Sequence, residues 1–400
     1  MSPVSRRADA NLTYPACRST STLWQGCSSS CTCGLGANIT GYGGTTANSR
    51  LHHLAALERS AAHGCGRRGC ASVADLVRGA RLATDPHAKR CALVFVGDSL
   101  SLQVYDAAAC SLQAGGAEEH RPLRDSFSAL RYLSTHPRLA NVTEYYSAPE
   151  NWPQWRQHTG HRFRNILGET HERYLRLPRD DGGGDVEIHM MLLWRWASSK
   201  VGPGGALAAH PGVPTLYEEL MQRLPRCTLT IYNEGLHAGV DSPSHYRSSV
   251  AEALDVFERV ASGRRSGPHA VDDLRRPTTF AWETVAQHFE TPGGDGEFEH
   301  RKRREHGAAN DSTAMYYLTG EWRRPQAECV DTPTPRVDWR DEIMAEEVET
   351  RPGVRLLPFH NASQAWGRLL HTSAGDCTHA RCFTPFFFAP LWEAAAQALA

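Results

Sequence analysis

The feature that most constrains the fold is the apolar run Ala92-Leu93-Val94-Phe95-Val96, which ends in Gly97-Asp98-Ser99. Such a run followed by a turn signal is typical of a strand buried on both faces of a sheet. Residues 100–113 then have helical character. Gly97 permits a sharp exit from the strand, and Asp98 is suited to cap the helix. The pattern predicts strand, turn and helix in succession, with Ser99 at the helix N-terminus.

Similar strand and helix patterns alternate along the rest of the chain. Further strands are expected over residues 187–194, 227–232, 278–282 and 354–357, and helices over 250–261, 338–349 and 387–399. This alternation predicts an α/β fold, and the continuous apolar character of the strands favours a parallel sheet. Residues 1–85 are rich in Ser, Gly, Thr and Cys. They predict an irregular, disulfide-stapled N-terminal extension before a main domain over residues 86–400.

Composition excludes several classes of protein. The chain has 400 residues, a formal net charge of -1 and 22% charged residues, as soluble globular proteins have. No global basic field indicates a nucleic-acid partner. The longest apolar runs, such as residues 188–194, are too short to span a bilayer.

Cysteines and glycosylation sequons indicate the compartment. The chain has 12 cysteines, and Asn-x-Ser/Thr sequons occur at Asn11, Asn38, Asn141, Asn310 and Asn361. Together they favour an oxidising compartment of the secretory pathway. Residues 1–30 contain no apolar signal-peptide core. We therefore expect that a signal or membrane anchor has been trimmed from this chain.

The early cysteines have an alternative interpretation as a zinc site. Its candidate ligands are Cys31, Cys33, Cys65, Cys70, His52 and His53. Structural zinc sites usually show two close cysteine pairs at regular spacing, and the spacing here is irregular. Disulfides are favoured, no metal site is predicted, and the connectivity cannot be read from the sequence.

Asp376-Cys377-Thr378-His379, near the C-terminus, supplies what Ser99 requires to act as a nucleophile. A serine hydroxyl needs an imidazole to take its proton and usually a carboxylate to orient that imidazole. Residues three apart in a helical turn share a face, so Asp376 can orient His379. Alternatively, Ser99 is only a helix cap and the Asp-His pair is a surface contact. Their joint occurrence, in this order, at the two ends of an α/β domain favours acyl transfer.

These two motifs resemble the PC-esterase group of the SGNH (GDSL-like) superfamily, which includes the plant trichome-birefringence-like polysaccharide O-acetyltransferases. The resemblance covers about residues 88–400. Supporting segments are Ile231-Tyr232-Asn233-Glu234-Gly235-Leu236-His237, Trp282-Glu283-Thr284 with Gln287-His288-Phe289, and Val354-Arg355-Leu356-Leu357-Pro358-Phe359. The chain departs from the plant members after the Gly-Asp-Ser motif, where it has Ser101-Leu102-Gln103 in place of Arg-Asn.

The resemblance implies a three-layer α/β/α fold of the SGNH-hydrolase type. It implies Ser99 as nucleophile, His379 as base and Asp376 as the group that orients the base. It further implies an oxyanion hole made by the Ser99 backbone N–H with groups at Asn233 and Gly235. No cofactor is implied.

Several of these residues have structural alternatives. Asn233 is almost equally suited to a turn at a strand end, and Gly235 to permitting that turn. His237 is expected to support the site or to be structural. His288, beside Phe289, is more typical of packing than of chemistry.

The function implied by the resemblance is O-acyl transfer, with an acetyl group moved to or from carbohydrate hydroxyls through an acyl-serine. The partners are then an acyl donor and a carbohydrate acceptor, and the expected location is the Golgi lumen, another secretory compartment or the cell exterior. One alternative is a carbohydrate O-acetylesterase that uses the same triad, because water can replace the acceptor. Another is a catalytically silent carbohydrate-binding module on this fold. Trp194, Trp196 and Trp282 are candidates for a sugar platform, although core packing is the commoner role of such residues.

Overall fold

The computed structural model describes residues 72–84, 87–121, 127–129, 131–132, 171–179, 184–194, 213–234, 243–263, 278–289, 329–330, 338–364, 377–378 and 388–399. Within them lies a seven-stranded sheet. Its strands are β1 (Arg90–Gly97), β2 (Glu118–Glu119), β3 (His171–Pro178), β4 (Asp185–Trp194), β5 (Cys227–Asn233), β6 (Thr278–Trp282) and β7 (Val354–Leu357).

The sheet is mixed, in the strand order β2-β3-β4-β1-β5-β6-β7. Strands β4, β1, β5, β6 and β7 are parallel, whereas β3 is antiparallel to β4 and β2 is antiparallel to β3. The expected parallel arrangement is confirmed for the five predicted strands, and it is wrong for β2 and β3, which make the sheet mixed. A hairpin joins β3 to β4, and the Arg179 N–H closes it by donating to the Gly184 carbonyl at 3.2 Å. Strands joined by a hairpin must run antiparallel.

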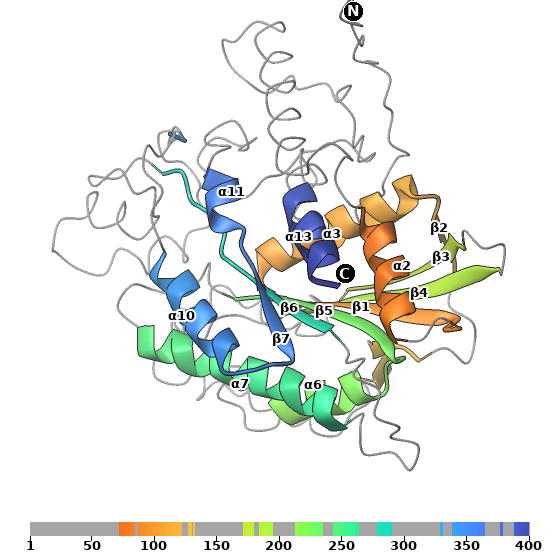
Figure 1. Cartoon of the computed structure of the whole chain (residues 1–400), viewed down its shortest axis with the longest axis horizontal. Coiled ribbons are helices and arrows are strands. Elements are labelled where there is room, and N and C mark those ends of the chain that lie inside the picture. The colour runs from red at the N-terminus through yellow and green to blue at the C-terminus, as the bar shows by residue number, and fades with distance from the viewer. Residues whose placement is uncertain are drawn as a thin grey trace, which may run out of the picture.

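Helices cover both faces of the sheet (Figure 1). On one face lie α2 (Val73–Thr84), α3 (Ser99–Ala114) and α13 (Ala389–Leu399), and on the other lie α6 (Val213–Gln222), α7 (Pro243–Gly263) and α10 (Trp339–Glu349). The short helix α11 (His360–Gln364) follows β7. Side chains of β1 alternate between the two cores: Leu93 and Phe95 pack on the first face, and Val94 and Val96 on the second. This two-sided burial explains the continuous apolar run.

The five strands predicted from apolar runs are confirmed as β1, β4, β5, β6 and β7. The helices predicted over 100–113, 338–349 and 387–399 are α3, α10 and α13, and the 250–261 pattern lies within α7. The expectation of irregular structure through residue 85 is wrong for α2, whose residues Val73, Leu76 and Val77 enter the core. The domain boundary at residue 85 stays a prediction. Among the helices described, none is long and apolar enough to cross a membrane.

The topology makes the carboxyl end of β1 the natural place for a site. Strand β4 pairs with one edge of β1 and β5 with the other. The chain therefore proceeds from β1 to one side of the sheet and later returns to the opposite side. In open α/β sheets such a reversal leaves a crevice at the carboxyl ends of the strands, where ligands bind.

Disulfides hold the fold at two described places. Cys91 and Cys227 join directly paired residues of β1 and β5, with a Cα–Cα distance of 4.6 Å. Cys329 is bonded to Cys377, and Cys110 is also disulfide-bonded. All five cysteines in the part of the chain described above are thus oxidised, which confirms the disulfide prediction for them. The cysteines and histidines of the zinc alternative lie outside that part.

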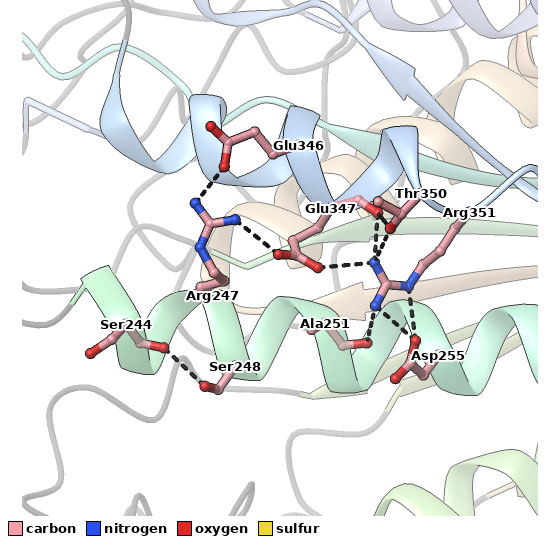
Figure 2. Close-up of polar contacts among 9 residues, drawn as sticks. All are labelled: Ser244, Arg247, Ser248, Ala251, Asp255, Glu346, Glu347, Thr350 and Arg351. Atoms are coloured by element: carbon pink, nitrogen blue, oxygen red, sulfur yellow. Dashed lines mark hydrogen bonds and ion pairs between the residues drawn. The ribbon is translucent and has the colours of Figure 1, made fainter.

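Two arginines tie α10 to α7 (Figure 2). Arg351, just beyond α10, donates to the Asp255 carboxylate at 2.9 Å, and to the Glu347 carboxylate at 3.0 Å and its carbonyl at 2.6 Å. Arg247 on α7 contacts Glu347 at 3.0 Å and also pairs with Glu346. The Arg351 side chain is 12% exposed and that of Arg247 is 43% exposed. Arg351, the more buried of the two, makes more hydrogen bonds, and solvent screens its charge less.

Arg351→Ala is expected to lower the free energy of unfolding by about 2 to 3 kcal/mol, because it removes half-buried hydrogen bonds to the Glu347 carboxylate and carbonyl and to the Ala251 carbonyl. Arg247→Ala, the matched control, is expected to cost less than about 1 kcal/mol, since exposed ion pairs contribute little. Urea unfolding of the two variants and the wild type measures both values. Equal losses for the two variants would contradict this assignment.

Candidate active site

The turn between β1 and α3 is fixed by Gly97 and Asp98. Gly97 has φ of +152°, and a Cβ atom added there would lie 2.0 Å from the Asn233 carbonyl oxygen. Only glycine therefore fits this position. Asp98 is fully buried and is the N-cap of α3, where its Oδ1 accepts from the Leu100 N–H at 3.0 Å. The predicted capping role of Asp98 is confirmed.

Ser99 is the first residue of α3, as the strand-turn-helix pattern predicts. Its backbone lies at the N-terminus of a helix of 16 residues. The N–H groups of a first helical turn have no partner within the helix, and the helix dipole favours negative charge there. The position suits a nucleophile whose reaction generates an oxyanion. The Ser99 side chain is outside the described part of the structure.

Asn233 lies beside this turn, because it is the last residue of β5 and the register partner of Gly97. Its side chain is fully buried, and its Nδ2 donates to the Trp282 carbonyl at 2.9 Å. This bond uses one of the two amide hydrogens and sets the orientation of the amide group. Its Oδ1 is buried and has no hydrogen-bond partner among the described residues. Gly235 and His237 lie outside those residues.

The interior of the C-terminal motif is held by the segment that follows β6, residues 283–289, here called the post-β6 segment. The His288 N–H donates to the Cys377 carbonyl at 2.9 Å. Gln287 Nε2 donates to the Thr378 hydroxyl at 3.0 Å. Asp376 and His379 themselves fall outside the residues described. Two strand spacings, about 10 Å in all, separate β1 from β6 in the sheet. The turn before Ser99 and the segment that contacts Cys377 and Thr378 thus both follow carboxyl ends of nearby parallel strands.

A cluster of buried charged residues contacts the post-β6 segment. It was not predicted from the sequence. Asp341 Oδ1 accepts from the Thr284 N–H at 2.7 Å, and Asp341 Oδ2 lies 3.0 Å from His360 Nδ1. His360 Nδ1 is also 3.0 Å from the Thr284 carbonyl. Arg340 binds Asp338 through both carboxylate oxygens. Asp338 is the N-cap of α10, whereas its neighbour His360 comes from beyond β7.

The same cluster is the group of side chains in the described residues that could hold a metal ion, with ligand atoms of Asp338, Asp341 and His360 within 4.8 Å of one another. Arg340 already occupies the Asp338 carboxylate, and His360 faces Asp341. The two carboxylates are therefore paired with two basic side chains of the protein, so the charges of the cluster are balanced without a metal.

Burial and these contacts move the pKa values of the cluster. Burial, together with the charge of Asp338, raises the pKa of Asp341 to about 6 against the opposing effect of His360. Burial disfavours the charged form of His360, but the hydrogen bond and charge of Asp341 outweigh it and raise the pKa of His360 above 6.5. For Asp338, burial is outweighed by Arg340, which lowers the pKa of that carboxyl.

These shifts predict a pH dependence of stability. A raised pKa in the folded state means that the contribution of His360 is complete below its ordinary pKa of 6.5 and is lost as pH rises through the higher folded value. His360→Asn keeps an N–H near the position of Nδ1 but does not titrate. Unfolding measured between about pH 6.5 and 8.5 should show a smaller loss of stability in this variant than in the wild type. Parallel curves over this range would refute the assignment.

Two other candidates are fully buried. Trp282 is fully buried, with its ring 5.6 Å from that of Phe359 and 5.9 Å from that of Phe388, so the sugar-platform expectation is wrong for Trp282. His288 is also fully buried, which agrees with its packing interpretation. The Trp194 side chain and Trp196 lie outside the described residues.

Two carboxylates near the site were not predicted, the half-buried Glu283 and the fully buried Glu234. Glu283 Oε2 accepts from the N–H groups of Phe359 and His360 at 2.7 and 3.0 Å, and so joins the carboxyl ends of β6 and β7. Glu234, next to Asn233, accepts from the Tyr232 hydroxyl at 2.9 Å and from the hydroxyl of Ser249, and so joins the carboxyl end of β5 to α7. Their only sequence signal is an acidic residue directly after an apolar strand.

No family model, no curated protein and no solved structure matches this chain. The likeness to the PC-esterase group therefore depends on the motifs quoted above.

Proposed function

We propose that this chain is an O-acyltransferase of the SGNH type that moves an acetyl group to or from carbohydrate hydroxyls. Ser99 is the nucleophile, His379 the base and Asp376 the group that orients it. The observation that carries the proposal is the position of Gly97-Asp98-Ser99 at the carboxyl end of the central strand, with Ser99 starting a long helix.

The surroundings of Ser99 support acyl chemistry. An acyl transfer passes through a tetrahedral oxyanion, which backbone N–H groups at a helix N-terminus stabilise. Asn233, at the end of the neighbouring strand and in register with Gly97, is proposed to offer the oxyanion its second amide hydrogen, since the first bonds the Trp282 carbonyl. Placement at the point where the strand order reverses also matches the usual location of a ligand crevice.

The reaction proceeds in two displacements. His379 accepts the Ser99 proton while the serine oxygen attacks the acyl carbonyl carbon. The bond to the donor oxygen then breaks, and His379 returns the proton to that oxygen. A sugar hydroxyl attacks the acyl-serine with His379 again as base, and Ser99 is regenerated. Water in place of the sugar gives the esterase reaction with the same residues.

The oxidised cysteines support the proposal of a secretory compartment, the Golgi lumen or the cell exterior. Disulfides persist in oxidising compartments and are rare in the cytosol. The pairs Cys91–Cys227 and Cys329–Cys377 are both formed.

Incubation with p-nitrophenyl acetate and neutral oligosaccharides tests the function. Acetylated oligosaccharide as a product supports the transferase. Acetate release alone, unchanged by the oligosaccharides, supports the esterase alternative. Oligosaccharide binding without any turnover of the ester would overturn the proposal in favour of a silent binding module.

A further inference from the structure

We infer that Cys329, Gln287 and Thr378 are positioning residues, which hold the Asp376–His379 motif in its catalytic place; this inference rests on the proposed function. Cys377 and Thr378 are the two interior residues of that motif. Successive Cα atoms lie about 3.8 Å apart, so anchoring the interior pair restricts both flanking residues.

The interior pair is anchored by three different contacts. The Cys377 carbonyl accepts from the His288 N–H at 2.9 Å, and the Cys377 sulfur is bonded to Cys329. The Thr378 hydroxyl accepts from Gln287 Nε2 at 3.0 Å. Cys377 is fully buried and Thr378 is 6% exposed. A backbone bond, a side-chain bond and a covalent bond thus act on two consecutive residues.

The far end of the disulfide is held by the same segment. Cys329 forms an antiparallel bridge with Phe289, and the Val330 N–H donates to the His288 carbonyl at 2.8 Å. The backbone of His288 therefore bonds to Val330 on one side and to Cys377 on the other. The disulfide thus joins two cysteines that are each already held by residues 288–289.

The post-β6 segment is itself rigidly supported. The Thr284 N–H donates to Asp341 at 2.7 Å, and the Ala286 N–H donates to the Ser363 hydroxyl at 2.8 Å. These bonds tie it to the start of α10 and to α11. A continuous set of contacts thus runs from two helices, through the post-β6 segment, to the interior of the motif.

Two double variants distinguish positioning from simple cross-linking. Cys329→Ala with Cys377→Ala is expected to lower kcat for p-nitrophenyl acetate by about 10- to 100-fold per folded molecule, because small displacements of a catalytic group cost this much. Cys91→Ala with Cys227→Ala removes a disulfide at the amino ends of β1 and β5. This control should lower the midpoint of urea unfolding and keep kcat within about twofold. KM should change little in both.

A second pair of variants tests the same inference without touching a disulfide. Thr378→Val is nearly isosteric but loses the hydroxyl, and should lower kcat by about 3- to 10-fold and shift the pH profile of kcat/KM, which reports the base. Thr378→Ser keeps the hydroxyl and should restore both. Wild-type kcat and pH profile in Thr378→Val and in the Cys329–Cys377 double variant would overturn the inference. Ser99→Ala in the same assay separates the two claims: if it retains turnover the proposed function fails, whereas its inactivity beside fully active positioning variants defeats only this inference.

Discussion

Ser99→Ala is expected to lower kcat for acetyl ester turnover by about 10⁴-fold or more while the protein stays folded. Removal of the nucleophile abolishes the acyl-serine route, and what remains is the rate that an oxyanion site gives to direct attack by water. Stability should hardly change, since Asp98 caps α3 and Ser99 does not. Steady-state kinetics with an active-site titration and a thermal melt measure both quantities.

Ser101→Ala is the matched control, because Ser101 lies in the same helical turn but is fully buried, with its hydroxyl donating to the Val96 carbonyl at 3.3 Å. This variant should lose about 1 kcal/mol of stability and keep its kcat. An active Ser99→Ala variant beside an inactive Ser101→Ala variant would move the nucleophile away from Ser99.

Gly97→Ala is expected to destabilise the protein by more than about 4 kcal/mol and to abolish activity in any folded fraction. The new Cβ would lie 2.0 Å from the Asn233 carbonyl oxygen and 2.2 Å from Ser101 Oγ. The positive φ of Gly97 adds backbone strain to this overlap. Relief would require β1 to move away from β5, which displaces Ser99 from Asn233.

Gly184→Ala is a control that introduces the backbone strain of a positive φ without steric overlap. Gly184 has φ of +89°, but a Cβ atom there would meet nothing within 4 Å. The Gly184→Ala variant should lose only about 1 to 2 kcal/mol of stability and should remain active. Chemical unfolding of the two alanine variants compares them directly. A Gly97→Ala protein as stable as the Gly184→Ala protein would show that the close approach of β1 and β5 at this point is not required.

The sequence predicted the parallel strands because they are buried on both faces and therefore apolar without interruption. Strand β3 was missed because His171, Glu172, Arg173 and Arg176 interrupt its apolar residues. Helix α2 was missed because it follows a Cys- and Gly-rich stretch that suggests irregular structure, although it packs in the core. At these two elements, local composition thus predicts a different structure from the one that tertiary packing stabilises.

The positions of the candidate site residues were predictable where these residues follow strands directly. Gly97, Asp98 and Asn233 lie where the apolar runs β1 and β5 end. The Asp341–His360 pair was not predictable, because it forms only when the start of α10 and the end of β7 meet at Thr284. Twelve cysteines allow too many pairings for the Cys329–Cys377 bond to be deduced from spacing.

Mass spectrometry of the protein after brief reaction with p-nitrophenyl acetate and an acid quench detects the proposed acyl-serine itself. One acetyl group is expected on the peptide that contains Ser99, present in the wild type and absent in Ser99→Ala. The adduct is expected to disappear when the protein is returned to neutral pH with an oligosaccharide acceptor or water. Turnover of the ester without an acetyl group on Ser99, or with a stable acetyl group on another residue, would contradict the proposed role of Ser99.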